Sequence, residues 1–92
     1  MKLEFSESAV RDLVRLREFI AKNDPQAAAR VSLRLRQAIG KLVLHPDIGR
    51  LVPEIENVRE LVAGNYVVRY IHEENTILVL RVWHGKEFRA FE

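Results

Sequence analysis

Three apolar runs separated by very short breaks fill the second half of the chain, and this spacing constrains the fold most strongly. The runs are VRELV at 58–62, YVVRYIH at 66–72 and TILVLRVWH at 76–84. Each run is rich in the β-branched and aromatic residues typical of strands, and the breaks AGN and EEN contain turn residues. A parallel return needs a dozen or more residues, so the sequence predicts an antiparallel meander of three strands.

A short strand and a first helix are predicted near the N-terminus. KLEF at 2–5 alternates weakly between polar and apolar residues, which is typical of a strand. Ser6 or Ser8 can cap the helix that follows. The helix is indicated by apolar residues at helical spacing, namely Leu13, Leu16 and Ile20.

A second helix is predicted to follow with almost no connection. Asp24 is a favourable N-cap and Pro25 fits the first helical position, so NDP at 23–25 ends one helix and starts the next. Such a short connection predicts an antiparallel helical hairpin. The second helix should extend to about His45, with an apolar stripe made of Ala28, Val31, Leu35, Ala38, Ile39 and Leu42.

These elements predict an α+β fold in one domain spanning residues 1–92, with the helical hairpin packed on one face of the meander. Side chains alternate across a strand, so residue parity sorts the two faces. The more uniformly apolar set should face the helices: Tyr66, Val68, Tyr70, Leu78, Leu80 and Val82. The opposite face should then carry Val67, Arg69, Ile71, Ile77, Val79, Arg81 and Trp83.

Arginine and tryptophan on the face away from the helices suggest a protein-binding surface, where both residue types are enriched. Arg69, Arg81 and Trp83 have the required parity, and Arg59 shares it if the register continues across the first turn. The alternative is a partly solvated sheet whose arginines pair with acidic residues, namely Glu60, Glu73 or Glu74.

Leu33, Gly40 and Leu44 form a second apolar line on the second helix, nearly opposite its core stripe. Such a line indicates burial against another element or against another chain. Charge is also uneven along the sequence, because residues 7–45 hold eight Lys and Arg against four Asp and Glu, whereas residues 46–92 hold six against eight. The basic half favours an acidic partner, although a solvated helix face is the simpler interpretation.

The sequence contains no cysteine and therefore no disulfide framework. No apolar run approaches the roughly 18 residues of a membrane span, and a signal-peptide core is absent, so we expect a cytoplasmic protein without membrane association. His45, His72 and His84 lack metal-ligand spacing, and no phosphate-binding or nucleophile motif occurs. We expect neither a metal nor a cofactor.

Several short motifs carry a family resemblance that covers nearly the whole chain. Three motifs occur in this order: HP-x-x-GR, REL-x-x-GNY-x-x-RY and LRV-x-HG. They lie within the segments HPDIGRLVPEIENVRELVAGNYVVRY and ILVLRVWHG, which follow the segment DLVRLREFIAKNDPQAAARV. With these motifs the chain resembles the RelE/ParE superfamily of bacterial toxin–antitoxin toxins, closer to the ParE branch. The resemblance implies a strand–helix–helix–three-strand fold and a cognate antitoxin, ParD-like and encoded beside the toxin, bound in a hetero-oligomer.

Two mechanisms are implied by the resemblance. ParE-like members inhibit DNA gyrase, with growth arrest and plasmid stabilisation as consequences, whereas RelE-like members cut mRNA on the ribosome. RelE-like nucleases resemble one another in two features. They have an Arg on the middle strand, where this chain has Val67. They also have an Arg followed by a Tyr or His in the C-terminal segment, where the last aromatic residue of this chain is Phe91. We therefore expect binding without catalysis, and no sequence-specific nucleic-acid binding by the toxin alone.

The residues expected to act are assigned accordingly. Target binding is predicted for Arg59, Arg69, Arg81, Trp83, Lys86 and Arg89. Antitoxin binding is predicted for the outward apolar residues Leu33, Leu44, Ile71 and Trp83. If the chain were instead a nuclease, its catalytic set would be Arg81, His84, Lys86 and Arg89. A third possibility is a non-toxic module that only binds the antitoxin.

Overall fold

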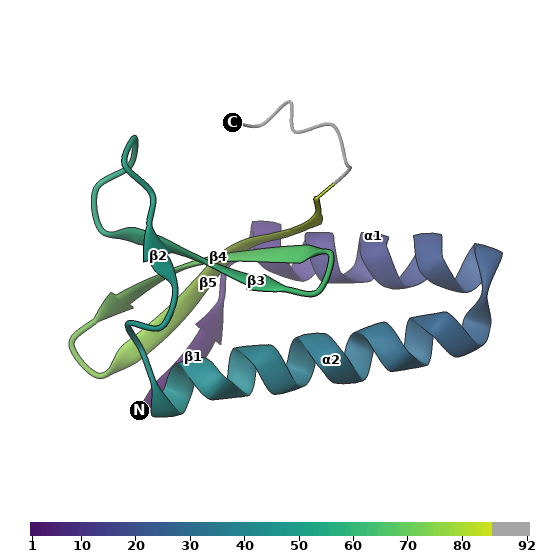
Figure 1. Cartoon of the computed structure of the whole chain (residues 1–92), viewed down its shortest axis with the longest axis horizontal. Helices are drawn as coiled ribbons and strands as arrows, with labels where there is room; N and C mark the ends of the chain where they lie inside the picture. The colour runs from purple at the N-terminus through teal and green to yellow at the C-terminus, as the bar shows by residue number, and fades with distance from the viewer. Residues whose placement is uncertain (86–92) are drawn as a thin grey trace.

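The computed structural model describes residues 1–85 and confirms the predicted fold (Figure 1). Two antiparallel helices meet at one end of the long axis, and the β4–β5 turn lies at the other end. Lys86 and Arg89 lie outside the described residues. In chain order the elements are β1 (Lys2–Phe5), α1 (Glu7–Asn23), α2 (Pro25–Leu44), β2 (Arg50–Leu51), β3 (Val58–Ala63), β4 (Tyr66–Glu73) and β5 (Thr76–His84).

Both helices begin at the caps that the sequence predicts. The Ser6 hydroxyl accepts a hydrogen bond from the backbone N–H of Ala9, which fixes the start of α1. The Asp24 carboxylate accepts from the N–H groups of Gln26 and Ala27, at 3.1 and 3.2 Å, and starts α2. Asp24 also donates its backbone N–H to Ile20, so one residue ends α1 and begins α2. Neither helix within residues 1–85 is long and apolar enough to cross a membrane.

The sheet is larger than the predicted meander. Its strand order is β1-β5-β4-β3-β2, because β1 pairs parallel to β5 and the two-residue strand β2 pairs with β3. The connector between α2 and β3 therefore contributes one short strand, at residues 50–51, which the meander prediction did not include. The two hairpin turns of the meander each contain a residue with positive φ, Gly64 at 61° and Glu74 at 50°.

The core lies between the helical hairpin and one face of the sheet, called here the inner face. α2 contributes the predicted stripe, of which all members except Val31 are buried, and Val31 packs against the core. The inner face of β4 contributes the predicted residues Tyr66, Val68 and Tyr70. These elements therefore pack as the apolar periodicities predict.

The predicted faces of β5 are wrong over its first half. The pairing jumps from Arg69 opposite Arg81 to Tyr70 opposite Val79, so Leu80 is an extra residue in β5. This β-bulge reverses the parity of the strand, because one extra residue moves all preceding side chains to the other face. Buried Ile77 and Val79 face the core, contrary to the prediction. Leu78, expected against the helices, lines a cleft on the opposite face, called here the outer face.

Candidate functional site

A row of charged residues crosses the outer face of the sheet. Arg50 on β2 lies opposite Glu60 on β3, Glu60 lies opposite Arg69 on β4, and Arg69 lies opposite Arg81 on β5. Arg69 donates from Nε to Glu60 Oε2 at 2.6 Å, and Arg50 lies 3.7 Å from the other carboxylate oxygen. Cross-strand neighbours on one face interact directly, so this charged row connects four of the five strands.

The charged row ends on a buried carboxylate of α1. Arg81 donates from Nε and Nη2 to both oxygens of Asp12, at 2.8 and 3.1 Å, and Arg15 donates to the same carboxylate at 2.7 Å. The backbone N–H of Val82 also donates to Asp12 at 2.9 Å. Burial raises the pKa of Asp12, but the hydrogen bonds from Arg81, Val82 and Arg15 outweigh it and hold the pKa below its ordinary value of 3.8.

Trp83 and Arg59 each differ from the sequence prediction, Trp83 in its exposure and Arg59 in its face. Trp83 faces outward but is 0% exposed, and the Arg69 guanidinium lies 5.0 Å from the centroid of its ring. The prediction that Trp83 is an exposed contact residue is therefore wrong. Arg59 is opposite Tyr70 on the inner face, because the turn after Ala63 changes the expected parity. It belongs to the inner face and not to the charged row.

Of the alternative nuclease set, the structure describes Arg81 and His84. His84 pairs opposite Tyr66 and packs edge-on against its ring, with 5.1 Å between centroids, on the inner face as its parity predicts. Arg81 belongs to the outer face and is held by Asp12. Val67, where the resemblance implies an arginine in the nucleases, lies opposite Trp83. The backbone therefore directs His84 and Arg81 to opposite faces of the sheet.

Tyr70 and Arg59 connect residues of the first two motifs through hydrogen bonds. Its hydroxyl donates to the carbonyl of Pro46 at 2.7 Å and accepts from the N–H of Gly49 at 2.9 Å. Arg59 donates to the carbonyl of Gly49 at 2.8 Å, so HP-x-x-GR is fixed onto β3 and β4. Burial raises the pKa of Tyr70 above its ordinary value of 10.0, although the hydrogen bond from Gly49 and the charge of Arg59 oppose this shift. These motif residues stabilise the loop.

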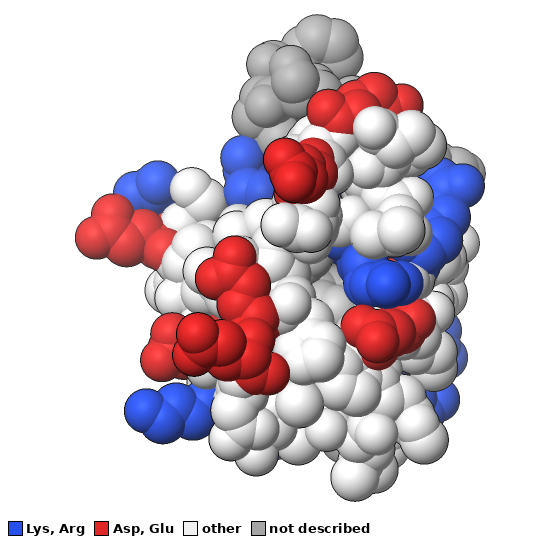
Figure 2. All heavy atoms as spheres, turned by 90° about the vertical axis from the view of Figure 1, so that its left-hand side faces the viewer, with Lys and Arg blue, Asp and Glu red and all other residues white. Residues whose placement is uncertain are grey.

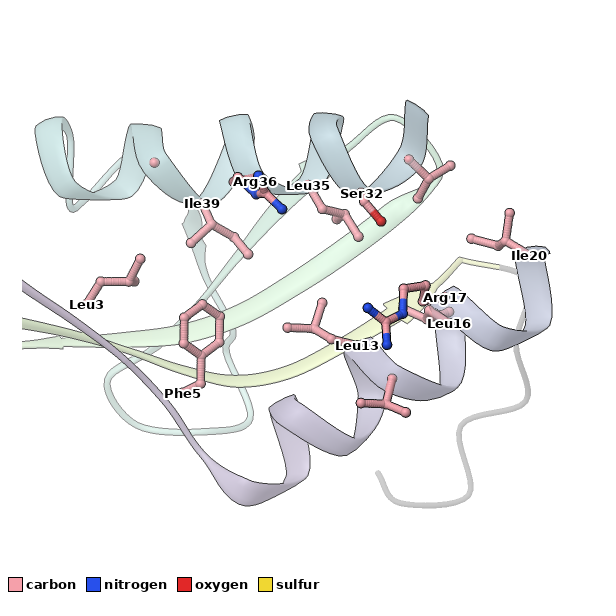
Figure 3. Close-up of a pocket in the computed structure, with 13 residues that line it drawn as sticks. Leu3, Phe5, Leu13, Leu16, Arg17, Ile20, Ser32, Leu35, Arg36 and Ile39 are labelled. Carbon is pink, nitrogen blue, oxygen red and sulfur yellow. The ribbon is translucent and has the colours of Figure 1, made fainter. Parts of the chain in front are cut away.

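An apolar groove of about 520 Å³ opens between α1, α2 and β1 (Figure 3). Its walls carry Leu13, Leu16 and Ile20 from α1, Leu35 and Ile39 from α2, and Leu3 and Phe5 from β1. Two exposed arginines, Arg17 and Arg36, lie at its rim. Gly40 also lines it, and a Cβ built there would meet no atom within 4 Å. The groove therefore combines apolar walls with a positive rim.

The four residues predicted to bind an antitoxin do not form one surface. Leu33 and Leu44 are exposed on α2, at 55% and 75%, as predicted. Ile71 lies in a cleft on the outer face, and Trp83 is buried. The groove is formed by other residues, because it depends on how β1 lies beside the helices. The helical periodicity assigns the helix residues of the groove walls to the apolar faces that form the core, and it does not predict that a groove opens beside them.

Asp12 was not among the residues predicted to matter. A signal for it exists, because Asp12 lies three residues after Ala9 and four before Leu16, both buried on the same side of α1. A carboxylate at such a position needs a partner in the sheet. Within residues 1–85, no group of three His, Cys, Asp or Glu residues is placed to hold a metal ion.

Comparison with known proteins identifies similar sequences and folds. Residues 3–88 match the family described as ParE toxin of type II toxin–antitoxin system, parDE. Toxin RelE2 of Caulobacter vibrioides is 36% identical over 78 residues, covering 84% of this chain and 86% of that protein. Toxin RelE1 of the same organism is also 36% identical, over 86 residues, covering 91% and 92%.

A similar fold occurs in a solved structure. The chain aligns with a chain from the chromosomal ParDE TA system from P. aeruginosa with a TM-score of 0.79 and 20% identity, covering 91% of this chain and 95% of that one. At this identity the likeness concerns the fold alone. It extends over both the helical hairpin and the sheet.

Proposed function

Because the chain belongs to the ParE toxin family of type II toxin–antitoxin systems, we propose that it arrests growth by binding DNA gyrase and is neutralised by a cognate antitoxin. The observation that carries the choice of binding over RNA cleavage is the composition of the outer face. Val67 occupies the position of the nuclease arginine, and its apolar side chain can stabilise no phosphate charge. Arg81 is engaged by a buried carboxylate, and His84 lies on the other face of the sheet.

Cleavage of ribosome-bound mRNA is the second candidate function. The names of the relatives favour it, since Toxin RelE1 and Toxin RelE2 are each 36% identical to this chain. In that case Arg81, His84, Lys86 and Arg89 would supply the chemistry. Metal-free cleavage needs activation of the 2′-OH, stabilisation of the phosphate and protonation of the leaving oxygen.

One expression experiment separates these functions. The wild-type chain is induced in bacteria, and covalent DNA–gyrase complexes, the SOS response and the ends of translated mRNAs are measured in the same cultures. Gyrase binding predicts trapped complexes and SOS induction with intact mRNAs. Cuts in translated mRNAs without DNA damage would instead establish the nuclease function. Normal growth with neither signal would identify a non-toxic module.

The apolar groove is the proposed binding site for the antitoxin. Its walls offer apolar contacts to an amphipathic segment, and Arg17 and Arg36 at the rim favour acidic side chains beside the apolar ones. Exposed apolar surface of this kind usually marks an interaction site. We expect the antitoxin to place a helix in this groove, with its apolar face toward the exposed side chains of Leu3, Phe5 and Val14.

Gly40 offers a matched pair of variants for testing the groove. Since a Cβ at position 40 meets no atom within 4 Å, Gly40→Ala should fold and bind the antitoxin like the wild type. Gly40→Trp should fold but fill the groove, and so reduce affinity for the antitoxin encoded beside the toxin by about tenfold or more. Affinity is measured by calorimetry on refolded chains, with circular dichroism as the folding control. Equal affinity of both variants would exclude the groove.

A further inference from the structure

The helix α2 carries four basic residues and no acidic residue between Pro25 and Leu44. The helix α1, by contrast, contains both acidic and basic residues. Residues 7–45 hold eight basic residues against four acidic ones, an excess of four, and α2 alone holds four against none. The positive charge of the first half of the chain therefore comes from α2. All four of its basic residues are exposed, namely Arg30, Arg34, Arg36 and Lys41.

Three of these basic residues follow one line along the helix. Arg30, Arg34 and Lys41 are separated by four and seven residues, and residues at such spacings lie above one another on a helix. Gln26 and Gln37 fall on the same line and are also exposed. Five side chains with hydrogen-bond donors thus follow one another at intervals of three or four residues, called here the donor row. At ~1.5 Å per residue the donor row is about 22 Å long.

The basic residues of the donor row are not neutralised by acidic side chains of the described chain. Within residues 1–85, no carboxylate forms an ion pair with Arg30, Arg34 or Lys41. Arg34 lies beside the β3–β4 turn, since a Cβ built on Gly64 would be 3.2 Å from its Nη1. Figure 2 shows acidic side chains gathered at the end of the molecule that carries the β4–β5 turn. The donor row therefore presents positive charge to solvent.

A straight row of donors without acceptors matches the chemistry of a phosphate backbone. Arg and Lys neutralise phosphates, and Gln side chains also donate to phosphate oxygens. One strand of duplex DNA carries a phosphate every ~3.4 Å along the helix axis, so a row about 22 Å long spans about six phosphates. A membrane surface fits less well, because a helix that lies on lipid needs a continuous apolar face. The exposed face of α2 has two isolated large apolar residues, Leu33 and Leu44.

We infer that the donor row of α2 binds the phosphate backbone of double-stranded DNA, without selecting a sequence. This inference rests on the proposed function, because DNA gyrase holds duplex DNA and the donor row would add a contact with that DNA to the contact with the enzyme. Phosphate contacts position a protein on DNA and carry no sequence information. Arg36 and Gly40, which line the apolar groove, lie on another side of α2, so the antitoxin and the DNA would occupy different surfaces.

The first experiment measures fluorescence anisotropy of two labelled DNA duplexes of unrelated sequence, titrated with the full refolded chain at several salt concentrations. Three phosphate contacts predict that log affinity falls with log salt with a slope of about −2.7, which is about 40-fold weaker binding between about 50 and 200 mM salt. The two duplexes should bind within about twofold of one another. A slope near zero, or a preference of about tenfold for one duplex, would overturn the inference.

The two helices offer a matched pair of double variants. Arg30→Gln with Lys41→Gln changes the donor row, and Arg11→Gln with Lys22→Gln changes α1. Each removes one Arg and one Lys that are exposed and eleven residues apart, so the net charge falls equally. The α2 variant should bind DNA about tenfold or more weakly in about 0.1 M salt, with a slope shallower by about 1.8, whereas the α1 variant should bind like the wild type. Equal losses in both variants, shown to be folded by circular dichroism, would contradict the donor row.

The same variants test other anionic partners. An RNA duplex that binds more tightly than the DNA duplexes, through the same two residues, would assign the donor row to RNA and overturn the inference. Vesicles containing phosphatidylglycerol that bind the wild type, lose the α2 variant and leave DNA binding unchanged would also overturn it. Affinity for the antitoxin should be equal in the wild type and the α2 variant. A loss of that affinity in the α2 variant would assign the donor row to the antitoxin instead.

A gyrase assay distinguishes failure of the inference from failure of the proposed function. The α2 variant should trap fewer covalent DNA–gyrase complexes than the wild type, and the α1 variant should trap as many. If the wild type binds duplex DNA through the donor row but traps no complexes, the proposed target fails and the DNA-binding surface stands. If the wild type traps complexes and the α2 variant traps as many, with unchanged affinity for DNA, the donor row is excluded and the proposed target stands.

Discussion

Arg81 and Asp12 form a two-point ion pair that joins β5 to α1, with Nε 2.8 Å from Oδ2 and Nη2 3.1 Å from Oδ1. The same carboxylate accepts the backbone N–H of Val82, and the Ser6 hydroxyl donates to the carbonyl of Leu80 at 2.8 Å. β1 ends its pairing with β5 at Val79. Side chains of α1 and of its N-cap residue therefore form hydrogen bonds with backbone groups at the edge of β5, beyond the last residue that pairs with β1.

Replacing Asp12 by Asn should lower the free energy of unfolding by about 3 kcal/mol at neutral pH, because breaking a buried ion pair leaves its partners without a countercharge. The Asp12 side chain is only 2% exposed, so water cannot replace the lost contacts. Urea denaturation followed by circular dichroism gives this difference. Glu18→Gln, at an exposed position of α1, is a suitable control and should change stability by less than about 0.5 kcal/mol.

Acid should destabilise the wild type through the same carboxylate. The pKa of Asp12 in the folded chain lies below its ordinary value of 3.8, so the stabilising contribution is complete above that pH. It is lost as the pH falls through the lowered pKa. The stability difference between wild type and Asp12→Asn should therefore shrink below about pH 4, as thermal unfolding at several pH values would show. A constant difference would contradict the assignment.

Tyr70→Phe should lower stability by about 1–3 kcal/mol, because the N–H of Gly49 and the carbonyl of Pro46 both lose their partner. The raised pKa of Tyr70 adds a dependence on pH with the opposite sign. Its contribution is complete below the ordinary pKa of 10.0 and is lost as the pH rises toward the higher value in the folded chain. Denaturant unfolding at neutral and alkaline pH measures both effects.

Gly49→Ala should destabilise the chain by about 1–3 kcal/mol, the usual cost of overpacking. A Cβ at position 49 would lie 2.8 Å from the backbone oxygen of Glu60 and from the Tyr70 ring and hydroxyl. Gly40→Ala is the matched control, since a methyl group fits there and alanine favours the helix by up to about 1 kcal/mol. Melting temperatures should therefore shift in opposite directions, and a shift in the same direction would be evidence against this packing.

His84→Ala should leave most of the toxicity, because binding requires no proton transfer. A general acid or base would lose about 10²- to 10⁴-fold in rate on the same change. The measurement is growth after induction, with antitoxin co-purification as the control for folding. Arg81→Ala is not a clean test of target binding, since it also removes the main partner of buried Asp12. Loss of toxicity in folded His84→Ala would support the nuclease candidate.

The sequence determined the elements and their order because the relevant signals are local. Caps at Ser6 and Asp24, the apolar stripe of α2 and the short breaks between strands each act within a few residues. The family could also be predicted from the sequence, because short motifs identify it. Residues of these motifs contact one another in the folded chain, where the backbone N–H of Gly49 donates to the Tyr70 hydroxyl. Both the fold and the family were confirmed.

Only the tertiary structure decided which side chains are available to a partner. The extra residue Leu80 reversed the faces of β5, and the pairing of β1 with β5 created the groove. The burial of Trp83 and the engagement of Arg81 by Asp12 depend on residues as much as 69 positions apart. Parity and periodicity describe one element at a time, so contacts between distant elements had to come from the folded chain.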